Sequence, residues 1–195
     1  MATPYRLTPA IRHAHKKIRH IIARSQVPED PLHAEDTLRL LLRIYPHADV
    51  GLRLAAIGHD IERAFPKGIK VERKHFDSYD EFKRRHAENS ARILGGLLLK
   101  CRVDEGLIER VKQLVLHHET GGFEDADILK DADSLSFFHT NLRHFMKREP
   151  YNRVLDRAVW GFKRLSPQGI GYLNALATKD VLLAKVLRDA GIRLG

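Results

Sequence analysis

The amino-acid sequence predicts an all-α fold of about seven or eight helices in one domain. Apolar residues recur at helical spacing nearly throughout, several segments open with N-cap or proline signals, and no alternating segment is long enough for a sheet. The 195 residues, 43% of them hydrophobic, suffice for one domain with a substantial core, and no internal repeat divides them. We therefore expect a single domain over residues 1–195.

Capping signals and breakers predict the helices of the N-terminal part. Thr-Pro and Asp-Pro dipeptides open helices over about 8–25 and 30–46, and an aspartate opens a third over about 49–65. Residues 67–77 are polar, basic and without period, which indicates a loop.

The C-terminal part is predicted to be helical to its end. The expected helices cover about 77–100, 104–119, 125–147, 150–165 and 166–190. Beyond about residue 147 the chain lacks candidate ligands apart from scattered acids, so the stretch 147–195 is interpreted as a helical extension that packs on the same domain.

The charge predicts an anionic partner. Lysine and arginine exceed acids by 34 to 25, and six bases, from Arg6 to Arg24, precede the first acid, Glu29. Nucleic acid and a phosphorylated small molecule both fit this excess. Residues 1–29 are consistent with an organelle transit peptide, but their isoleucine stripe favours a basic amphipathic helix of the domain.

Several protein classes are excluded by composition. The longest nearly apolar stretch, residues 93–99, is far shorter than the roughly 20 residues of a spanning helix, so no membrane span is expected. The single cysteine, Cys101, rules out a disulfide framework. Without a signal-peptide pattern, we expect a cytoplasmic protein.

Polar residues interrupt the apolar faces of five predicted helices. Burying such a group without a partner costs several kcal/mol, and a divalent cation can compensate several groups at once. Imidazole and carboxylate ligands suit zinc, iron, manganese or nickel. In chain order, the candidate ligands are His33, His59, Asp60, His86, His117, His118, and Asp131 or Asp133.

This ordered set resembles the HD-domain superfamily of metal-dependent phosphohydrolases, whose fold is an all-α bundle. The resemblance covers about residues 30–136 and implies a primary metal site of His33, His59, Asp60 and Asp133. It favours Asp133 over Asp131 because the family's ligand lies in Ala-Asp-x-Leu, the context of Asp133. The additional residues His86, His117 and His118 are similar to those of binuclear branches, in which the aspartate of the His-Asp pair bridges two ions.

One binuclear branch, the HD-GYP cyclic dinucleotide phosphodiesterases, is similar at two places. The segment from His59 to Arg63 is similar to its His-Asp-Ile-Gly-Lys, and residues 117–119 match its His-His-Glu. The Gly-Tyr-Pro that names the branch is absent, so the resemblance implies the metal site but not cyclic dinucleotide specificity.

The expected activity is hydrolysis of a nucleotide or another small phosphate mono- or diester. Two cations bridged by Asp60 would polarise a phosphoryl oxygen and supply a hydroxide, and Arg63, about one turn further along, would contact the phosphate. Basic residues of the loop would attract the anion: Lys67, Lys70, Arg73 and Lys74. Iron, manganese, zinc, nickel, cobalt and magnesium are not distinguished, and Glu62 and Glu119 are expected to be solvated.

The ligand set and the charge also fit two other functions. The same ligand set suits a di-iron HD-type enzyme that uses dioxygen. A basic nucleic-acid-binding module with a structural metal would also carry this charge, although no nucleic-acid motif is present, and non-specific attraction to nucleic acid is expected in any case. The oligomeric state has no signal in the sequence.

Overall fold

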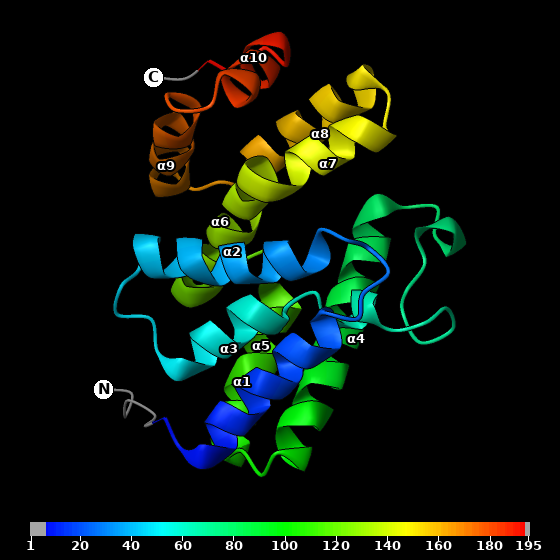
Figure 1. Ribbon diagram of the computed structural model, residues 1–195, viewed down its shortest axis with the longest axis vertical. Coiled ribbons are helices and arrows are strands. Elements are labelled where there is room, and N and C mark those ends of the chain that lie inside the picture. The colour runs from blue at the N-terminus through cyan, green and yellow to red at the C-terminus, as the bar shows by residue number, and fades with distance from the viewer. Residues whose placement is uncertain (1–6, 194–195) are drawn as a thin grey trace.

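The computed structural model describes residues 7–193, and within this range the chain forms helices and no strand (Figure 1). The prediction of an all-α fold is therefore confirmed. Arg6 and the two ends of the expected 1–195 domain lie outside the described residues. None of the described helices is both long and apolar enough to cross a membrane.

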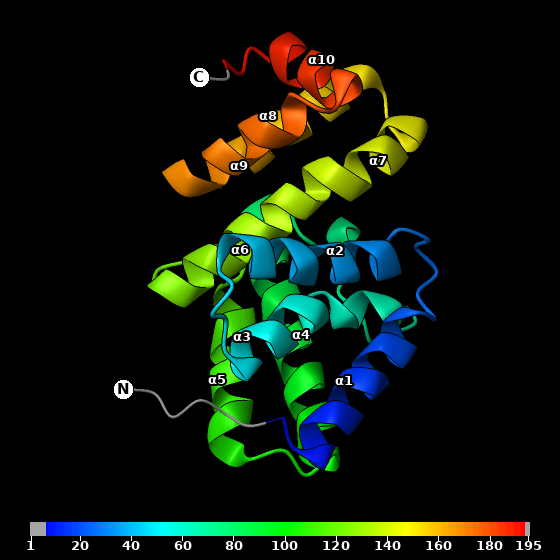
Figure 2. The ribbon, with the colours of Figure 1, turned by 60° about the vertical axis from the view of Figure 1, so that its left-hand side comes forward.

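Five helices form a bundle at one end of the molecule, the lower end in Figures 1 and 2. The long helix α4 packs on α5, α3 packs on both α5 and α2, and α1 contacts α2, α3 and α4. The core between them is made of fully buried aliphatic side chains such as Ile18, Leu52 and Leu114. The five helices are α1 (Pro9–Ile22), α2 (Asp30–Ile44), α3 (Val50–Gly58), α4 (Tyr79–Lys100) and α5 (Glu105–His117).

The helix α6 packs along α2 and leads to the other end of the molecule, where α7–α10 gather (Figure 2). Its axis continues through a π-helical turn, η3, into α7, so the expected helix over 125–147 is present but interrupted. Helix α8 packs on α10, and α9 packs on α6. The elements are α6 (Glu124–Ser136), η3 (Phe137–Asn141), α7 (Leu142–Arg148), α8 (Tyr151–Lys163), α9 (Pro167–Ala177) and α10 (Val181–Asp189).

The predicted end of the third helix was wrong. The third helix ends at Gly58 instead of Phe65, and the short 3-10 helix η1 (Ile61–Ala64) follows it. A Cβ on Gly58 would lie 2.8 Å from a methyl of Leu94, so α3 ends in close contact with α4.

The expected helix over 166–190 is in fact two helices. Asp180 caps α10 by accepting hydrogen bonds from the backbone N–H groups of Leu182 and Leu183, both at 3.1 Å. A new N-cap therefore restarts the chain in a different direction after α9.

The basic loop lies beside the first half of α4, as drawn at the right of Figure 1. It contains one short 3-10 helix, η2 (Arg73–His75). A buried acid holds it: the Glu62 carboxylate accepts a hydrogen bond of 2.7 Å from the backbone N–H of Val71. The loop is thus fixed to the residues that follow the His-Asp pair.

Candidate metal centre

Two histidines at helix ends are positioned by the same kind of hydrogen bond to the backbone of their own helix. His59 follows the last residue of α3, and His118 follows the last residue of α5. The Nδ1 of each ring donates to the carbonyl three residues earlier, at 2.9 Å to Ala56 and 2.6 Å to Val115. Carbonyls only accept, so Nδ1 carries a proton in each ring, and Nε2 is the atom that faces the other polar groups. Both Nε2 atoms are buried, and neither has a well-formed hydrogen bond within residues 7–193, although carboxylate oxygens of Asp133 and Glu119 lie 3.5 and 3.2 Å from them.

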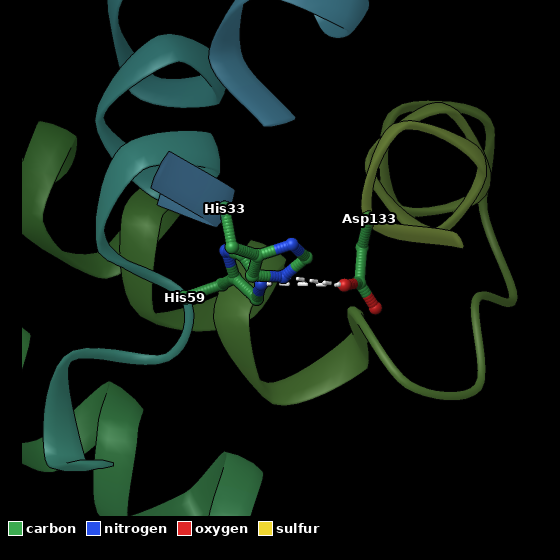
Figure 3. Close-up of side chains that lie close together, drawn as sticks. All are labelled: His33, His59 and Asp133. Atoms are coloured by element: carbon green, nitrogen blue, oxygen red, sulfur yellow. Dashed lines mark ion pairs between the residues drawn. The ribbon is translucent and has the colours of Figure 1, made fainter. Parts of the chain in front are cut away.

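His33 of α2 and Asp133 of α6 complete a first group of donors around His59 (Figure 3). The Nε2 atoms of His33 and His59 lie 3.1 and 3.5 Å from Oδ1 of Asp133. The Ser136 hydroxyl donates to the backbone carbonyl of His33 and accepts from its Nδ1 at 2.9 Å, which again directs Nε2 inward. Three separate elements therefore present ligand-type atoms to one point.

Asp60 lies at the centre of the histidines. Its Oδ1 is 2.7 Å from Nε2 of His86, 3.8 Å from Nε2 of His59 and 4.0 Å from Nε2 of His118. Its Oδ2 accepts from Arg63 at 3.0 Å and is 3.9 Å from Nε2 of His33. Although burial acts to raise its pKa, His59, Arg63 and His86 hold the pKa of Asp60 well below its ordinary value.

His86 of α4 lies between two carboxylates. Its Nε2 donates to Asp60 and its Nδ1 to Glu62, each at 2.7 Å, so both ring nitrogens carry protons. Burial lowers the pKa of His86, but these two acids outweigh it and raise the pKa to about 9. A metal ion bound here would have to displace one of these protons.

A second group of donors consists of His86, His118 and Glu119. Oε1 of Glu119 lies 3.2 Å from Nε2 of His118. Lys83 forms a close ion pair with this carboxylate. Arg164 forms two ion pairs, with Glu119 at 3.1 Å and with Asp133 at 2.9 Å. Burial acts to raise the pKa of Glu119, but Lys83, Arg164 and His118 hold it well below its ordinary value.

The donor atoms fit divalent metal. In each of three groups the ligand atoms lie within 4.8 Å of one another: His33 with His59 and Asp133, His59 with Asp60 and His118, and His86 with His118 and Glu119. The buried Nε2 atoms of His59 and His118 are the strongest sign, because an unpaired imidazole nitrogen costs free energy in a protein interior. Mixed nitrogen and oxygen donors suit first-row transition metals.

Not every predicted site residue reaches this cluster. The structure does not bring His117 to it, because the ring packs edge-on against Phe123 and Nδ1 lies 3.2 Å from the Gly121 carbonyl. Asp131, the alternative to Asp133, accepts from the backbone N–H of Ser166 at 2.8 Å, at the start of α9. Arg63 bridges two acids, Asp60 and Asp30, at 3.0 and 2.9 Å.

A cavity of about 480 Å³ opens beside the cluster, and His86, Glu62 and Arg63 form its inner wall. Its other lining residues come from the α1–α2 connection, the basic loop, the start of α4 and α8. Lys70, Arg73 and Lys74 line it as the sequence predicts, whereas Lys67 does not. The volume suits a small-molecule ligand.

Sequence reasoning missed three site residues. Glu62 and Glu119, expected to be solvated, are 1% and 9% exposed and contact His86 and His118. Arg164 comes from the stretch expected to serve only for packing. Glu119 directly follows the histidine pair, which is a usable signal, but nothing in the sequence separates Arg164 from Lys163 beside it.

Comparison with known proteins adds a family. No curated protein and no solved structure matches the chain. The family model described as "Domain of unknown function (DUF4202)" matches residues 7–186, which is most of the chain, and the protein therefore belongs to the DUF4202 family.

Proposed function

We propose that this protein is a metal-dependent phosphohydrolase of the HD type that acts on a small phosphate ester and holds two divalent cations. The observation that carries the proposal is the convergence of His33, His59, Asp60, His118 and Asp133, all buried except the partly buried Asp60, with two Nε2 atoms that lack a hydrogen bond within residues 7–193. The cationic cavity beside it supports an anionic substrate. The resemblance to the HD-domain superfamily, including the order of the ligands along the chain, supports the same conclusion.

The residues divide into two ligand sets with one carboxylate between them. His33, His59 and Asp133 would hold one ion, His86 and His118 the other, and Asp60, close to histidines of both sets, would bridge them. Bound divalent cations supply Lewis acidity at a phosphoryl oxygen and lower the pKa of coordinated water.

The protein's own groups bind and orient the anion. Arg63 is held by Asp30 and Asp60 with its side chain one-third exposed, so its guanidinium is fixed at the boundary of cluster and cavity. A planar guanidinium with two N–H edges can bind carboxylate on one side and a phosphate on the other. Glu62 fixes the ring of His86 and, through Val71, the basic loop, so ligand geometry and substrate cavity are coupled.

The test is a turnover assay on protein purified without chelator. We expect hydrolysis of at least one member of a panel of nucleotides and phosphate mono- and diesters, and loss of that activity on chelation. Asp60→Asn keeps the side-chain volume but removes the bridging charge, and it should abolish turnover and bound metal together. The matched control is Asp80→Asn, at an exposed acid in the first turn of α4, which should leave both unchanged.

Iron bound to the wild-type protein, with oxygen consumption and no ester hydrolysis, would replace the proposal with an oxygen-using enzyme. Full turnover in metal-free Asp60→Asn protein would contradict any role for this cluster. Binding of random DNA with a steep salt dependence, and no hydrolysis, would favour a nucleic-acid-binding module.

A further inference from the structure

The cavity beside the cluster has a strong excess of positive charge. Two acids line it, Glu62 and Glu72, against six bases: Arg63, Lys70, Arg73, Lys74, Lys83 and Arg157. Glu62 is already engaged with His86 and the loop backbone. The lining is therefore built for an anion of more than one charge.

Half of these bases are paired with acids and half are not. Arg63, Lys74 and Lys83 form ion pairs with Asp60, Glu72 and Glu119. No carboxylate within residues 7–193 pairs with Lys70, Arg73 or Arg157. Arg73 is engaged with backbone carbonyls, which leaves Lys70 and Arg157 as the cations of the cavity that have neither a carboxylate nor a carbonyl partner in the described structure.

Arg157 of α8 is fixed by aromatic side chains. Its guanidinium carbon lies 4.0 Å from the ring centroid of Trp160 and 5.1 Å from that of Phe137. One N–H group donates to the Tyr79 hydroxyl at 2.6 Å, and the other N–H groups have no partner among the described residues. Cation–π contacts hold the group in place while leaving its positive charge uncompensated by an acid.

The same aromatic rings argue against a stacked base at this place. Trp160 also faces the guanidinium carbon of Arg164 at 4.6 Å and the Nζ of Lys83 at 5.6 Å, and Tyr79 packs edge-on to it at 5.7 Å. Rings surrounded by cations in this way have little free face for a nucleobase. The unmatched cations beside them favour a phosphate group.

We infer that Arg157, together with Lys70, is the receptor for a second, non-reacting phosphate group, so that the substrate is a small ester carrying two or more phosphates. The inference rests on the proposed function, since one phosphoryl group would react at the cluster, next to Arg63 and His86. The other phosphate group would occupy the outer part of the cavity. It also gives α8, outside the helices that carry the ligands, a direct part in substrate selection.

Binding of two stable probes tests the inference without requiring turnover. Methylenediphosphonate carries two anionic groups and methylphosphonate carries one. Titration calorimetry is performed with both, on protein as purified and on protein stripped of metal. We expect wild-type protein to bind the diphosphonate at least tenfold more tightly. Arg157→Gln should lose about tenfold in diphosphonate affinity and less than twofold in methylphosphonate affinity.

Further variants keep the test independent of folding. Lys70→Gln, in the loop, should lose two- to fivefold for the diphosphonate, and Arg157→Lys should recover part of the loss. The matched control is Arg153→Gln, one turn earlier on α8 and exposed, which lines a neighbouring cavity and should change neither affinity.

The results separate the two proposals. The receptor would be overturned if wild-type protein did not discriminate between the probes. It would also be overturned if Arg157→Gln and Lys70→Gln proteins bound both probes as the wild type does. Neither result would contradict metal binding at the cluster. Protein stripped of metal that still shows the Arg157-dependent preference would uphold the receptor, whereas metal-loaded wild-type protein that shows this preference but hydrolyses no phosphate ester would contradict the metal-dependent function alone.

Discussion

The bundle α1–α5, taken together with α6, and the C-terminal helices α7–α10 contribute different chemistry to the same place. The bundle supplies imidazole and carboxylate groups, whose orientation is fixed locally by carbonyls such as those of Ala56 and Val115. The C-terminal helices and their connections supply guanidinium groups, Arg157 at the cavity and Arg164 at the cluster. The rings of His59 and His118 are thus oriented within their own helices, and those of His33 and His86 by neighbouring elements of the same region. Arg157 and Arg164, in contrast, reach the site only because the two regions pack together.

The largest expected effect comes from the contact between the two regions. Arg164→Met leaves the buried carboxylates of Asp133 and Glu119 without this cation, so the metal-free protein should lose about 3–5 kcal/mol of unfolding free energy. Added metal should restore part of the loss because the ion neutralises Asp133. Denaturant unfolding with and without metal measures both quantities. An unfolding free energy equal to that of the wild type would show that the two regions are not coupled at this point.

The two aspartates of α6 should separate ligand binding from packing. Asp133→Asn should weaken metal binding at least about 100-fold, because removing an outer partner of a ligand already costs 10- to 100-fold. Asp131→Asn should leave metal affinity unchanged and cost about 1–2 kcal/mol of stability through the weakened contact to Ser166. Competition with a chromogenic chelator gives the affinities. The reverse ranking would assign the ligand to Asp131.

The stability of the bundle should fall with rising pH in the metal-free protein. The pKa of His86 is raised to about 9 from an ordinary 6.5, so the protonated form is stabilised by folding. This stabilisation is complete below pH 6.5 and is lost as the pH rises through about 9, a decrease of about 1–3 kcal/mol. Chemical unfolding between pH 6 and 10 measures it, and His86→Gln should flatten the curve. If the unfolding free energy of the wild type changed with pH in parallel with that of the variant, the ion pairs of His86 with Asp60 and Glu62 would be contradicted.

The smallest expected effect distinguishes two adjacent histidines. His117→Gln should change metal affinity less than twofold, because this ring contacts Phe123 away from the donor groups. His118→Gln removes a buried Nε2 and should lower affinity by far more. Metal titration of the pair of variants checks the difference, and equal losses would mean that both rings bind.

Much of the fold could be predicted because helix signals are local. Thr8, Asp49 and Ser166 cap the helices that their positions predict. The end of α3 at Gly58 was not predicted, because the first clear helix breaker in the sequence is Pro66, eight residues further along the chain. The second cap at Asp180 was available in the sequence and was overlooked.

The candidate site divides in the same way. The candidate ligands His33, His59 and Asp133 stand out because polar residues interrupt apolar faces at separate helices. Arg164 and Arg157 do not, because one arginine on a basic helix resembles any other until the fold places it against an acid or an aromatic ring. Long-range packing, which a single sequence does not display, decides their part in the site.

If the histidines and aspartates of the cluster hold two metal ions, the purified protein contains them, and its metal content can be measured. Elemental analysis by mass spectrometry on protein purified anaerobically without chelator should give close to two ions per chain. Asp60→Asn protein prepared in parallel should contain almost none. One ion per chain would reduce the site to a mononuclear centre. A wild-type protein that contains no metal, and retains none after each divalent ion is added in turn, would contradict the account.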